Sequence, residues 1–396
     1  MAERILMLGY AGMIAQERVM QWALESGHEI LVLTPQIFPP KFIESERLTL
    51  ITFPHAWLPT SVEGAAEQIM APLAALIRDV YHLYRPTLAH LHGLNNGIIS
   101  LVAAGIPISK IVSVWGGLNT ILYAAQHYVS GNRAMDRCLE CLSAMDAVIV
   151  ESPLQVEVMR SRYPSVKEVA MIPMGVDTER FSRSPSVRRA AYVNRLRYGI
   201  APDDFVFCSP RGFAPSYRPA EILRAFGEGD SYFAKRSWLL IVGLRRQGAR
   251  DSLKQLWQQM VALSHALGVN ERIVWIPELP YAEMPSLYGM SDVVINMPVA
   301  DAFPSTILEA MACERLVISS DLPTYHTTPV YEHLWRVSPH DQSQLTERMV
   351  EATRLSPTDY SALGASARAA IIGKLDKQES VRQMQSLYCR LIAQGT

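Results

Sequence analysis

The sequence predicts an α/β protein with two doubly wound parallel sheets in series, one in each half of the chain. Short runs of β-branched and apolar residues alternate with helical patterns through both halves, which is typical of parallel strands covered by helices. Pro173–Asp177 and the polar stretch Ser182–Ser186 separate the two series. A chain of 396 residues is also too long for one hydrophobic core, so two domains are expected.

The first series runs strand, loop, helix, strand over four segments: Arg4–Leu8, Gly9–Gly12, Ile14–Ser26 and Glu29–Thr34. Gly27 follows the helix where a C-cap glycine belongs, and Pro35 closes the second strand. The alternation continues over four more segments: Leu88–His92, Gly97–Ala104, Lys110–Val114 and Ala147–Glu151. This half is expected to form one domain, residues 1–175.

The second series follows a helix expected over Val187–Tyr198. Strands and helices then alternate over these segments: Phe205–Ser209, Pro219–Phe226, Trp238–Val242, Ser252–Leu267, Arg272–Ile276, Met284–Met290, Val293–Asn296, Ser305–Cys313 and Leu316–Ser319. They predict a second domain, residues 176–376. A last helix, about 377–396, is expected to pack back on the first domain. Ligands of open parallel sheets bind at the carboxyl ends of the strands.

The composition excludes several classes of protein. Hydrophobic residues make up 49% and charged residues 19%, which argues against disorder. A formal net charge of −1 lacks the basic footprint of a nucleic-acid binder. An anionic ligand must therefore be held by a few placed groups. One C-x-x-C pair, Cys138 and Cys141, cannot supply the four ligands of a structural zinc site, so no metal is expected.

The chain is expected to be cytoplasmic. Glu3 and a very short apolar run argue against a signal peptide. The most apolar stretch, Ile98–Val114, is too short for a membrane span and is interrupted by Pro107 and Lys110. Five cysteines in so long a chain do not indicate a disulfide framework.

The segment Asp301–Cys313 is the most informative in the chain, because it follows a predicted strand and opens a helix. Pro304 suits the start of that helix, and Ser305 and Thr306 leave free backbone N–H groups in its first turn. Such a terminus attracts anions through its donors and its dipole.

Two carboxylates accompany this helix start. Glu309, one turn further in, could accept hydrogen bonds from two ribose hydroxyls. Asp301 is expected to lie free in the loop before the helix, where it could accept hydrogen bonds from a sugar. An ordinary amphipathic helix with an acidic approach is the alternative interpretation.

The segment Asp301–Cys313 resembles the E-x7-E region of the retaining GT-B glycosyltransferases of family 4, the glycosyl transferases group 1, and its last part, Ile307–Cys313, reads ILEAMAC. Met174–Phe181 is similar to the interdomain GVD-x-x-x-F string of that family, and Met284–Val294 to its L-Y-x-x-A/S-D-V unit. These segments occur in the family's order, and the spacing agrees over nearly the whole chain.

The resemblance implies a GT-B fold, in which two Rossmann-like domains face each other across a cleft. It implies an N-terminal acceptor domain and a C-terminal domain that binds a nucleoside-diphosphate sugar. The implied activity is transfer of a sugar, such as a hexose, to an acceptor hydroxyl with retention of configuration. Neither a metal nor a cofactor is required. The base, the sugar, the acceptor and the oligomeric state are left open.

In the donor domain the resemblance assigns the ribose to Glu309 and the sugar hydroxyls to Asp301, where aspartate replaces the usual glutamate. Arg211 occupies the first diphosphate-binding position. Arg218 is the candidate for the second, with Lys235–Arg236 as a weaker alternative. The other expected donor contacts are Gly243, Pro277, Glu278, Leu279, Phe303, Pro304, Ser305, Thr306 and Ile307.

In the acceptor domain Gly9 and Gly12 resemble the family's first glycine-bearing loop, although a plain turn would explain them equally well. The expected acceptor or sugar contacts are His92, Trp115, Gly116 and Asn119. Trp115 stands where many relatives have a histidine, so His92, Asn119 or an aromatic platform would have to replace it.

Two alternative functions remain. A nucleotide-sugar 2-epimerase would share the fold without needing an acceptor, and a catalytically silent sugar-nucleotide-binding subunit would bind the donor without transfer.

The helix Val187–Gly199 carries Arg188, Arg189, Arg195 and Arg197. We interpret it as a solvated face, with peripheral contact to an anionic membrane as the alternative.

Overall fold

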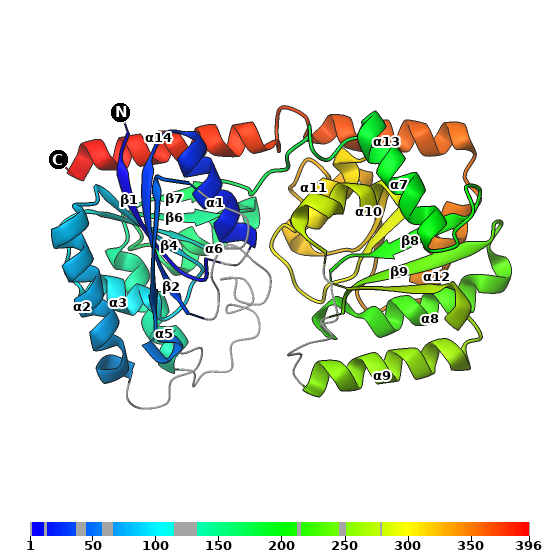
Figure 1. The fold of residues 1–396 in the computed structure, drawn as a ribbon, viewed down its shortest axis with the longest axis horizontal. Coiled ribbons are helices and arrows are strands. Elements are labelled where there is room, and N and C mark those ends of the chain that lie inside the picture. The colour runs from blue at the N-terminus through cyan, green and yellow to red at the C-terminus, as the bar shows by residue number, and fades with distance from the viewer. Residues whose placement is uncertain are drawn as a thin grey trace. The chain divides into compact units, whose positions relative to one another are not determined.

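The computed structural model describes residues 2–11, 14–36, 45–57, 66–114, 133–211, 215–244, 251–277 and 279–395. The chain divides into two compact units (Figure 1). Unit 1 comprises Met1–Met174 and Gln378–Thr396, and unit 2 comprises Gly175–Lys377. Each unit contains one parallel sheet with helices on both faces, which confirms the predicted fold class.

The sheet of unit 1 has the strand order β3-β2-β1-β4-β5-β6-β7, and all neighbours are parallel. The strands are β1 Arg4–Leu8, β2 Glu29–Pro35, β3 Leu48–Phe53, β4 Leu88–His92, β5 Ser109–Ser113, β6 Ala147–Val150 and β7 Val169–Met171. The helices are α1 Ile14–Glu25, α2 Ala66–Tyr84, α3 Gly97–Ala103, α5 Arg133–Glu140, α6 Pro153–Arg162 and α14 Lys377–Gly395.

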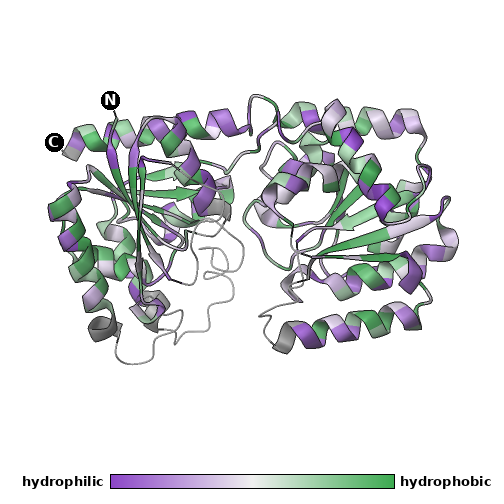
Figure 2. Ribbon diagram, viewed as in Figure 1, coloured by the Kyte–Doolittle hydropathy of each residue, from purple (hydrophilic) through white to green (hydrophobic). Residues whose placement is uncertain are grey.

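The core of unit 1 lies on both faces of this sheet. Alternate strand residues such as Ile5 and Met7 pack with α1 and α14, whereas Leu6 and Leu8 pack with α2, α3, α5 and α6. Strands buried on both faces need continuous apolar runs, which is why their positions could be predicted from the sequence. Figure 2 shows the strands of both units as mainly hydrophobic, with mixed helices around them.

The C-terminal helix α14 is part of unit 1. Tyr388 is fully buried, and its hydroxyl lies 2.6 Å from Nδ1 of His90 at the sheet. The Ser109 hydroxyl donates to the Leu391 carbonyl at 2.9 Å. The chain leaves unit 2 through a parallel bridge between Val176 and Asp376, so the entering and leaving segments lie together.

The sheet of unit 2 has the parallel order β10-β9-β8-β11-β12-β13. Its strands are β8 Phe205–Ser209, β9 Ser237–Leu244, β10 Ile273–Pro277, β11 Val293–Asn296, β12 Leu316–Ser320 and β13 Leu334–Val337. Its helices are α7 Pro185–Arg197, α8 Pro219–Gly229, α9 Asp251–Ala266, α10 Met284–Met290, α11 Ser305–Ala312, α12 Gln342–Thr353 and α13 Pro357–Ile371.

One face of the unit 2 sheet is covered by α8, α9 and α12, and the other by α7, α10, α11 and α13 (Figure 1). Short 3-10 helices connect several elements: His55–Trp57, Cys141–Ala144, Pro215–Tyr217, Asp230–Tyr232, Asn270–Arg272, Tyr281–Glu283, Pro323–Tyr325 and Tyr331–His333. The strand β13 and the helices α12 and α13 extend this unit beyond the predicted elements, so the second sheet does not end at β12.

Candidate functional site

The carboxyl ends of β8 and β11 lie side by side in unit 2, since these strands are neighbours in the sheet although distant in sequence. The chain continues from β8 to β9 on one side and reaches β11 on the other, so the strand order reverses here. Open parallel sheets bind ligands at such a point. Arg211 follows β8 and Asp301 follows β11, so the topology brings both predicted residues to it.

Arg211 is held in place by a carboxylate and an aromatic ring. Its Nη1 lies 2.8 Å from Oδ2 of Asp301, and its Nη2 donates a hydrogen bond of 2.9 Å to the Tyr217 hydroxyl. The guanidinium also lies 4.3 Å from the centre of the Tyr217 ring. Burial lowers the pKa of Arg211, but Asp301 and Tyr217 outweigh burial and raise it. Arg211 is therefore a charged, oriented donor at the strand ends.

Asp301 lies in the predicted loop before α11, but its side chain is already paired with Arg211, and its contact with a sugar stays a prediction. Its side chain is only 3% exposed, and Oδ1 accepts a hydrogen bond of 2.9 Å from the backbone N–H of Ala302. The Thr324 hydroxyl donates to the Asp301 carbonyl at 3.0 Å. Burial raises the pKa of Asp301, and the guanidinium of Arg211 opposes that rise. The carboxylate is thus first of all the counter-charge of Arg211.

Arg218 is the residue that precedes α8, and its backbone is in the left-handed region with φ 55° and ψ 47°. Non-glycine residues rarely adopt this conformation, and where they do it often accompanies function. Nε lies 3.7 Å from the Glu221 carboxylate, and the buried Nη1 has no hydrogen-bond partner among the described residues. A buried, loosely paired cation suits a site that receives an anion.

The alternative cations, Lys235 and Arg236, do not reach this point. They are exposed and directly precede β9, which places them at the amino end of a parallel strand. The ligand-binding edge is formed by the carboxyl ends. This weaker alternative was wrong.

The helix α11 begins without a side-chain cap. Pro304 is its N-cap residue with ψ 130°, and the N–H of Ile307 donates to the Pro304 carbonyl at 3.1 Å. The side chains of Phe303 and Ile307 are buried in the core, so these residues offer a ligand only their backbone. The first-turn amides of Ser305 and Thr306 are the donors that this helix start could offer to an anion, and their use by a ligand stays a prediction.

Glu309 lies inside unit 2, one turn after this helix start. It is 4% exposed, and its Oε2 accepts a hydrogen bond of 2.9 Å from the hydroxyl of Tyr288, which is fully buried. Burial raises the pKa of Tyr288 well above its ordinary value, and the charge of Glu309 adds to that rise. Tyr288 is therefore a permanent donor to this carboxylate.

The ends of β9 and β10 carry the remaining predicted donor contacts. Gly243 has φ +102°, a conformation that only glycine adopts without strain. The register of β9 and β10 shifts before Pro277, which pairs with Leu244. Leu279 packs against the core, whereas Glu278 lies outside the described residues. A residue-specific role for this edge stays a prediction.

In unit 1 the strand order reverses between β1 and β4, and Gly9 and His92 meet there. A Cβ atom at Gly9 would lie 2.6 Å from Oε1 of Gln16 and 3.0 Å from the His92 carbonyl, so glycine is required for close packing as well as for the turn. His92 is 7% exposed and stacks on His90 at 4.1 Å. Burial lowers the pKa of His92 to about 3, so the ring is neutral.

His90 is a structural group, because its ring nitrogens bind the hydroxyls of Tyr388 and Ser113, each at 2.6 Å. Burial lowers its pKa well below the ordinary value. The other expected contacts of this half lie outside the described residues: Gly12, Trp115, Gly116 and Asn119.

Tyr325 and Asn296 belong to the same polar cluster, and the sequence analysis missed them. Tyr325 follows β12 and is fully buried. Burial raises its pKa well above the ordinary value, the charge of Asp301 adds to this, and Arg211 opposes it. Asn296 ends β11, and its Nδ2 donates to the Ser319 hydroxyl at 3.3 Å. Asn296 ends β11 and Tyr325 follows β12, and this position at the carboxyl ends of predicted strands is the sequence signal that could have identified them.

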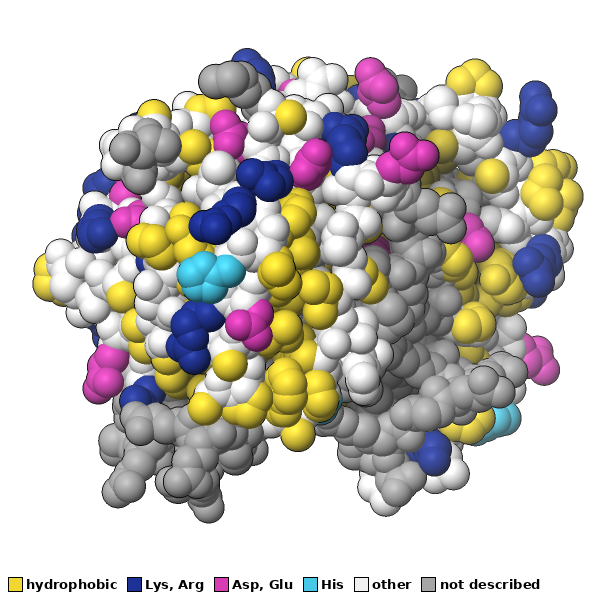
Figure 3. Space-filling model, turned by 60° about the vertical axis from the view of Figure 1, so that its left-hand side comes forward, with side chains coloured by type: hydrophobic (Ala, Val, Ile, Leu, Met, Phe, Trp, Pro, Cys, Tyr) yellow, Lys and Arg dark blue, Asp and Glu magenta, His cyan; other side chains and the backbone are white. Residues whose placement is uncertain are grey.

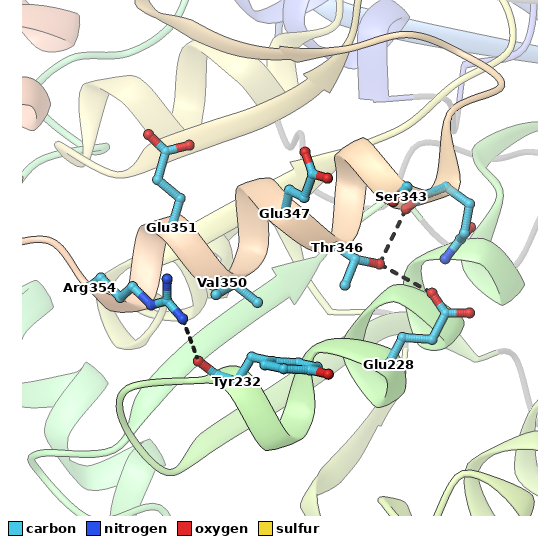
Figure 4. A pocket seen from close by; sticks show the side chains of 9 residues that line it. Glu228, Tyr232, Ser343, Thr346, Glu347, Val350, Glu351 and Arg354 are labelled. Atoms are coloured by element: carbon cyan, nitrogen blue, oxygen red, sulfur yellow. Dashed lines mark hydrogen bonds between the residues drawn. The ribbon is translucent and has the colours of Figure 1, made fainter.

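A surface groove of about 740 Å³ runs between α8 and α12, away from these strand ends (Figure 4). Three carboxylates, Glu228, Glu347 and Glu351, line it together with a single cation, Arg354. The Thr346 hydroxyl donates to Glu228 at 3.2 Å. So many carboxylates would repel an anionic ligand, so this groove is not the predicted donor site.

The arginines of α7 do not all belong to one solvated face. Arg195 is an anchor, since Nη2 lies 2.9 Å from Asp292 and Nε donates to the Met290 carbonyl. Arg188, Arg189 and Arg197 are exposed. Three apolar side chains are also more than half exposed on this helix: Tyr192, Val193 and Leu196. Contact with an anionic membrane stays a prediction.

No helix in the described ranges has the length and apolar character needed to cross a membrane. Among the same residues there is no group of three or more His, Cys, Asp or Glu side chains placed to hold a metal. On the face drawn in Figure 3, basic and acidic side chains are interspersed among hydrophobic ones rather than gathered by sign.

Two family models match the chain. A model of the glycosyl transferases group 1 matches residues 194–369, and one of glycosyltransferase family 4 matches residues 17–180. The D-inositol 3-phosphate glycosyltransferase of Actinosynnema mirum is 25% identical over 185 residues, 46% of this chain and 42% of that protein. The D-inositol 3-phosphate glycosyltransferase of Nocardia farcinica is 27% identical over 157 residues, which cover 39% of this chain and 32% of that protein. The chain spans less than half the length of these curated relatives.

Solved structures resemble the whole chain. Sucrose-phosphate synthase from Thermosynechococcus elongatus has a TM-score of 0.78 and 17% identity, covering 99% of both chains. Anabaena Alr3699/HepE in complex with UDP-glucose has a TM-score of 0.76 and 17% identity, covering 98% of this chain and 100% of that one. At this identity the likeness concerns the fold.

Proposed function

We propose that this chain, in which residues 194–369 match the glycosyl transferases group 1 and residues 17–180 match glycosyltransferase family 4, transfers a sugar from a nucleoside-diphosphate donor to an acceptor hydroxyl. One observation carries the proposal: the Arg211 side chain, 15% exposed, is oriented where the strand order of unit 2 reverses, with Nη1 2.8 Å from Oδ2 of Asp301. An oriented guanidinium at Arg211, a loosely paired one at Arg218 and the helix start at Ser305 come together at one sheet edge, and this combination suits an anionic ligand.

In this proposal the donor diphosphate is held by Arg211, by Arg218 and by the N–H groups of Ser305 and Thr306. Guanidinium groups bind phosphate oxygens through parallel hydrogen bonds, and the backbone amides of the helix start add further donors that carry no net charge. Glu309 accepts hydrogen bonds from the ribose. The same cations stabilise the charge that grows on the departing diphosphate.

The reaction breaks the bond between the sugar C1 and the diphosphate oxygen and forms a bond between C1 and the acceptor oxygen. The acceptor proton goes to the departing phosphate. We propose retention of configuration, with attack from the face that the diphosphate leaves. We also propose that no metal is needed, because the guanidinium groups supply the positive charge. Product NMR would report the anomer, and full activity in EDTA is expected.

Uridine is the base that we propose to test first, because Anabaena Alr3699/HepE has this fold and was solved with UDP and with UDP-glucose. A thermal-shift screen with UDP, GDP, CDP, ADP and TDP is expected to give one clearly stabilising nucleotide. A protein stabilised by none of the five would contradict the proposed donor site.

Nucleotide release separates this function from a silent binding subunit. The preferred nucleotide sugar is incubated with the protein, with and without a panel of free sugars and polyols, and the released nucleoside diphosphate is measured. We expect release that depends on the acceptor. Tight donor binding without release for any acceptor would favour the silent subunit. The comparisons lend no support to a 2-epimerase.

A further inference from the structure

Tyr288 and Glu309 form a buried pair in unit 2 that joins two neighbouring helices. Tyr288 lies in α10 and Glu309 in α11, and the tyrosine hydroxyl donates to Oε2 at 2.9 Å. Tyr288 is 0% exposed and Glu309 is 4% exposed. The pair sits beneath the helix start that carries Ser305 and Thr306, so it lies next to the proposed donor site.

A carboxylate taken out of water needs hydrogen-bond donors, because a buried charge without them is costly. It can accept several hydrogen bonds at once, and the Tyr288 hydroxyl donates one of them to Oε2. The tyrosine ring is rigid, since it packs in the apolar cluster with Phe181 at 5.9 Å between ring centres. A fixed ring with a permanently protonated hydroxyl fixes the orientation of the carboxylate that it contacts.

We propose that Tyr288 is a positioning residue for the donor ribose, which it serves by holding the Glu309 carboxylate toward the two ribose hydroxyls. The inference rests on the proposed function, because it requires a nucleotide donor. Tyr288 itself does not touch the donor. Its hydroxyl therefore affects affinity only for ligands whose ribose hydroxyls reach Glu309.

The test compares two nucleotides on the full chain. One is the nucleoside diphosphate selected by the thermal-shift screen, and the other is its 2′,3′-dideoxy analogue. Calorimetric titration of Tyr288→Phe is expected to show about tenfold weaker binding of the ribonucleotide, the scale of one hydrogen bond to a charged group. Binding of the dideoxy analogue is expected to be unchanged.

Glu309→Ala supplies the second half of a double-mutant cycle. In that background Tyr288→Phe is expected to have no further effect on either nucleotide, because the group through which it acts is gone. A purely structural role of Tyr288 would lower both affinities together, and this outcome would overturn the inference. Unchanged affinity for both nucleotides in Tyr288→Phe would overturn it as well.

Tyr360→Phe is the matched control. Tyr360 is also in unit 2, and its hydroxyl donates to the Asp292 carbonyl at 2.6 Å, away from the strand ends. This variant loses a hydrogen bond of similar kind, and we expect wild-type nucleotide affinity. Failure of the wild type to bind any of the five nucleotides would instead contradict the proposed function.

A crystal of the wild type with the selected nucleotide gives an answer even if Tyr288→Phe does not fold. We expect a ribose hydroxyl on the Glu309 carboxylate, with the Tyr288 hydroxyl still on Oε2. A ribose bound elsewhere would overturn the inference.

Discussion

The two units share a parallel sheet with a reversal of strand order, yet the residues placed at the reversal differ in chemistry. In unit 2 the strand ends carry the ion pair of Arg211 and Asp301, and both charges act on Tyr325, which follows β12. In unit 1 they carry Gly9 and His92, packed against each other. Burial lowers the pKa of His92 to about 3, so its ring stays neutral.

In the proposed function, this difference would assign two different tasks to the two units. Charged groups with fixed partners suit a diphosphate, which needs oriented positive donors. A neutral imidazole offers a donor or an acceptor without charge, which suits an uncharged hydroxyl. The comparison therefore supports the proposed donor site in unit 2.

The largest effect is expected at Arg211. Replacement by alanine should reduce turnover by about 10²–10³-fold, the scale for loss of one oriented donor to the charge that develops on a leaving group. The melting temperature reports whether unit 2 remains folded. Arg224→Ala, on the exposed side of α8, is the control and should keep wild-type turnover. Unchanged turnover in Arg211→Ala would remove it from the mechanism.

Glu309→Ala should be next in size. We expect donor affinity to fall by about 10–100-fold, because hydrogen bonds to a charged group contribute about 1.5–3 kcal/mol. Calorimetric titration with the preferred nucleoside diphosphate measures it. Wild-type affinity in this variant would mean that Glu309 is only a satisfied core carboxylate, and unit 2 would lose its proposed ribose contact.

The neutral histidine of unit 1 predicts a dependence of stability on pH. His92 has a pKa of about 3 when folded and about 6.5 when unfolded, so protonation favours the unfolded chain between these values. The free energy of unfolding should fall by about 1.4 kcal/mol per pH unit below 6.5, about 2 kcal/mol by pH 5. His90 contributes in the same direction.

Chemical denaturation at pH 7 and pH 5 measures this loss. His92→Asn should lose less stability over the interval than the wild type, because one titrating group is gone. His340→Asn, at an exposed position of unit 2, should keep the wild-type dependence. The same loss in His92→Asn as in the wild type would mean that water reaches this ring, and the contrast between the units would weaken.

The smallest effect is expected at Arg218, where stability and activity should move in opposite directions. Glycine accepts φ 55° without the clash of a Cβ atom, which relieves about 1 kcal/mol of strain. Arg218→Gly should therefore keep or slightly raise the melting temperature while turnover falls. If both fall together, the arginine is structural, and the second phosphate cation has to be sought elsewhere.

The sequence predicts elements best where strands are buried on both faces. The apolar runs at β1, β4, β8 and β11 gave the observed bounds. The edge strand β3, Leu48–Phe53, was missed because polar and apolar residues mix in it and most of its side chains are partly exposed. The strand β13 and the helices α12 and α13 were also missed, although Leu345, Met349 and Ala352 recur in α12 with the spacing of an amphipathic helix.

The sequence predicts which residues belong to the candidate site, but it does not predict the contacts between them. A cation after β8 and a carboxylate after β11 could be identified in the sequence. Their ion pair could not, because it depends on β8 and β11 being neighbours in the sheet. Tyr288 was matched to a motif, but its bond to Glu309 depends on the packing of α10 against α11. Lys235 and Arg236 precede β9, and their position at the amino end of a parallel strand is enough to separate them from the ligand-binding edge.

A crystal grown with the preferred nucleoside diphosphate tests the central claim most directly. We predict the two phosphates within hydrogen-bond distance of Arg211 and of the backbone amides of Ser305 and Thr306. Clear density for the nucleotide at another place, with these groups untouched, would contradict the account.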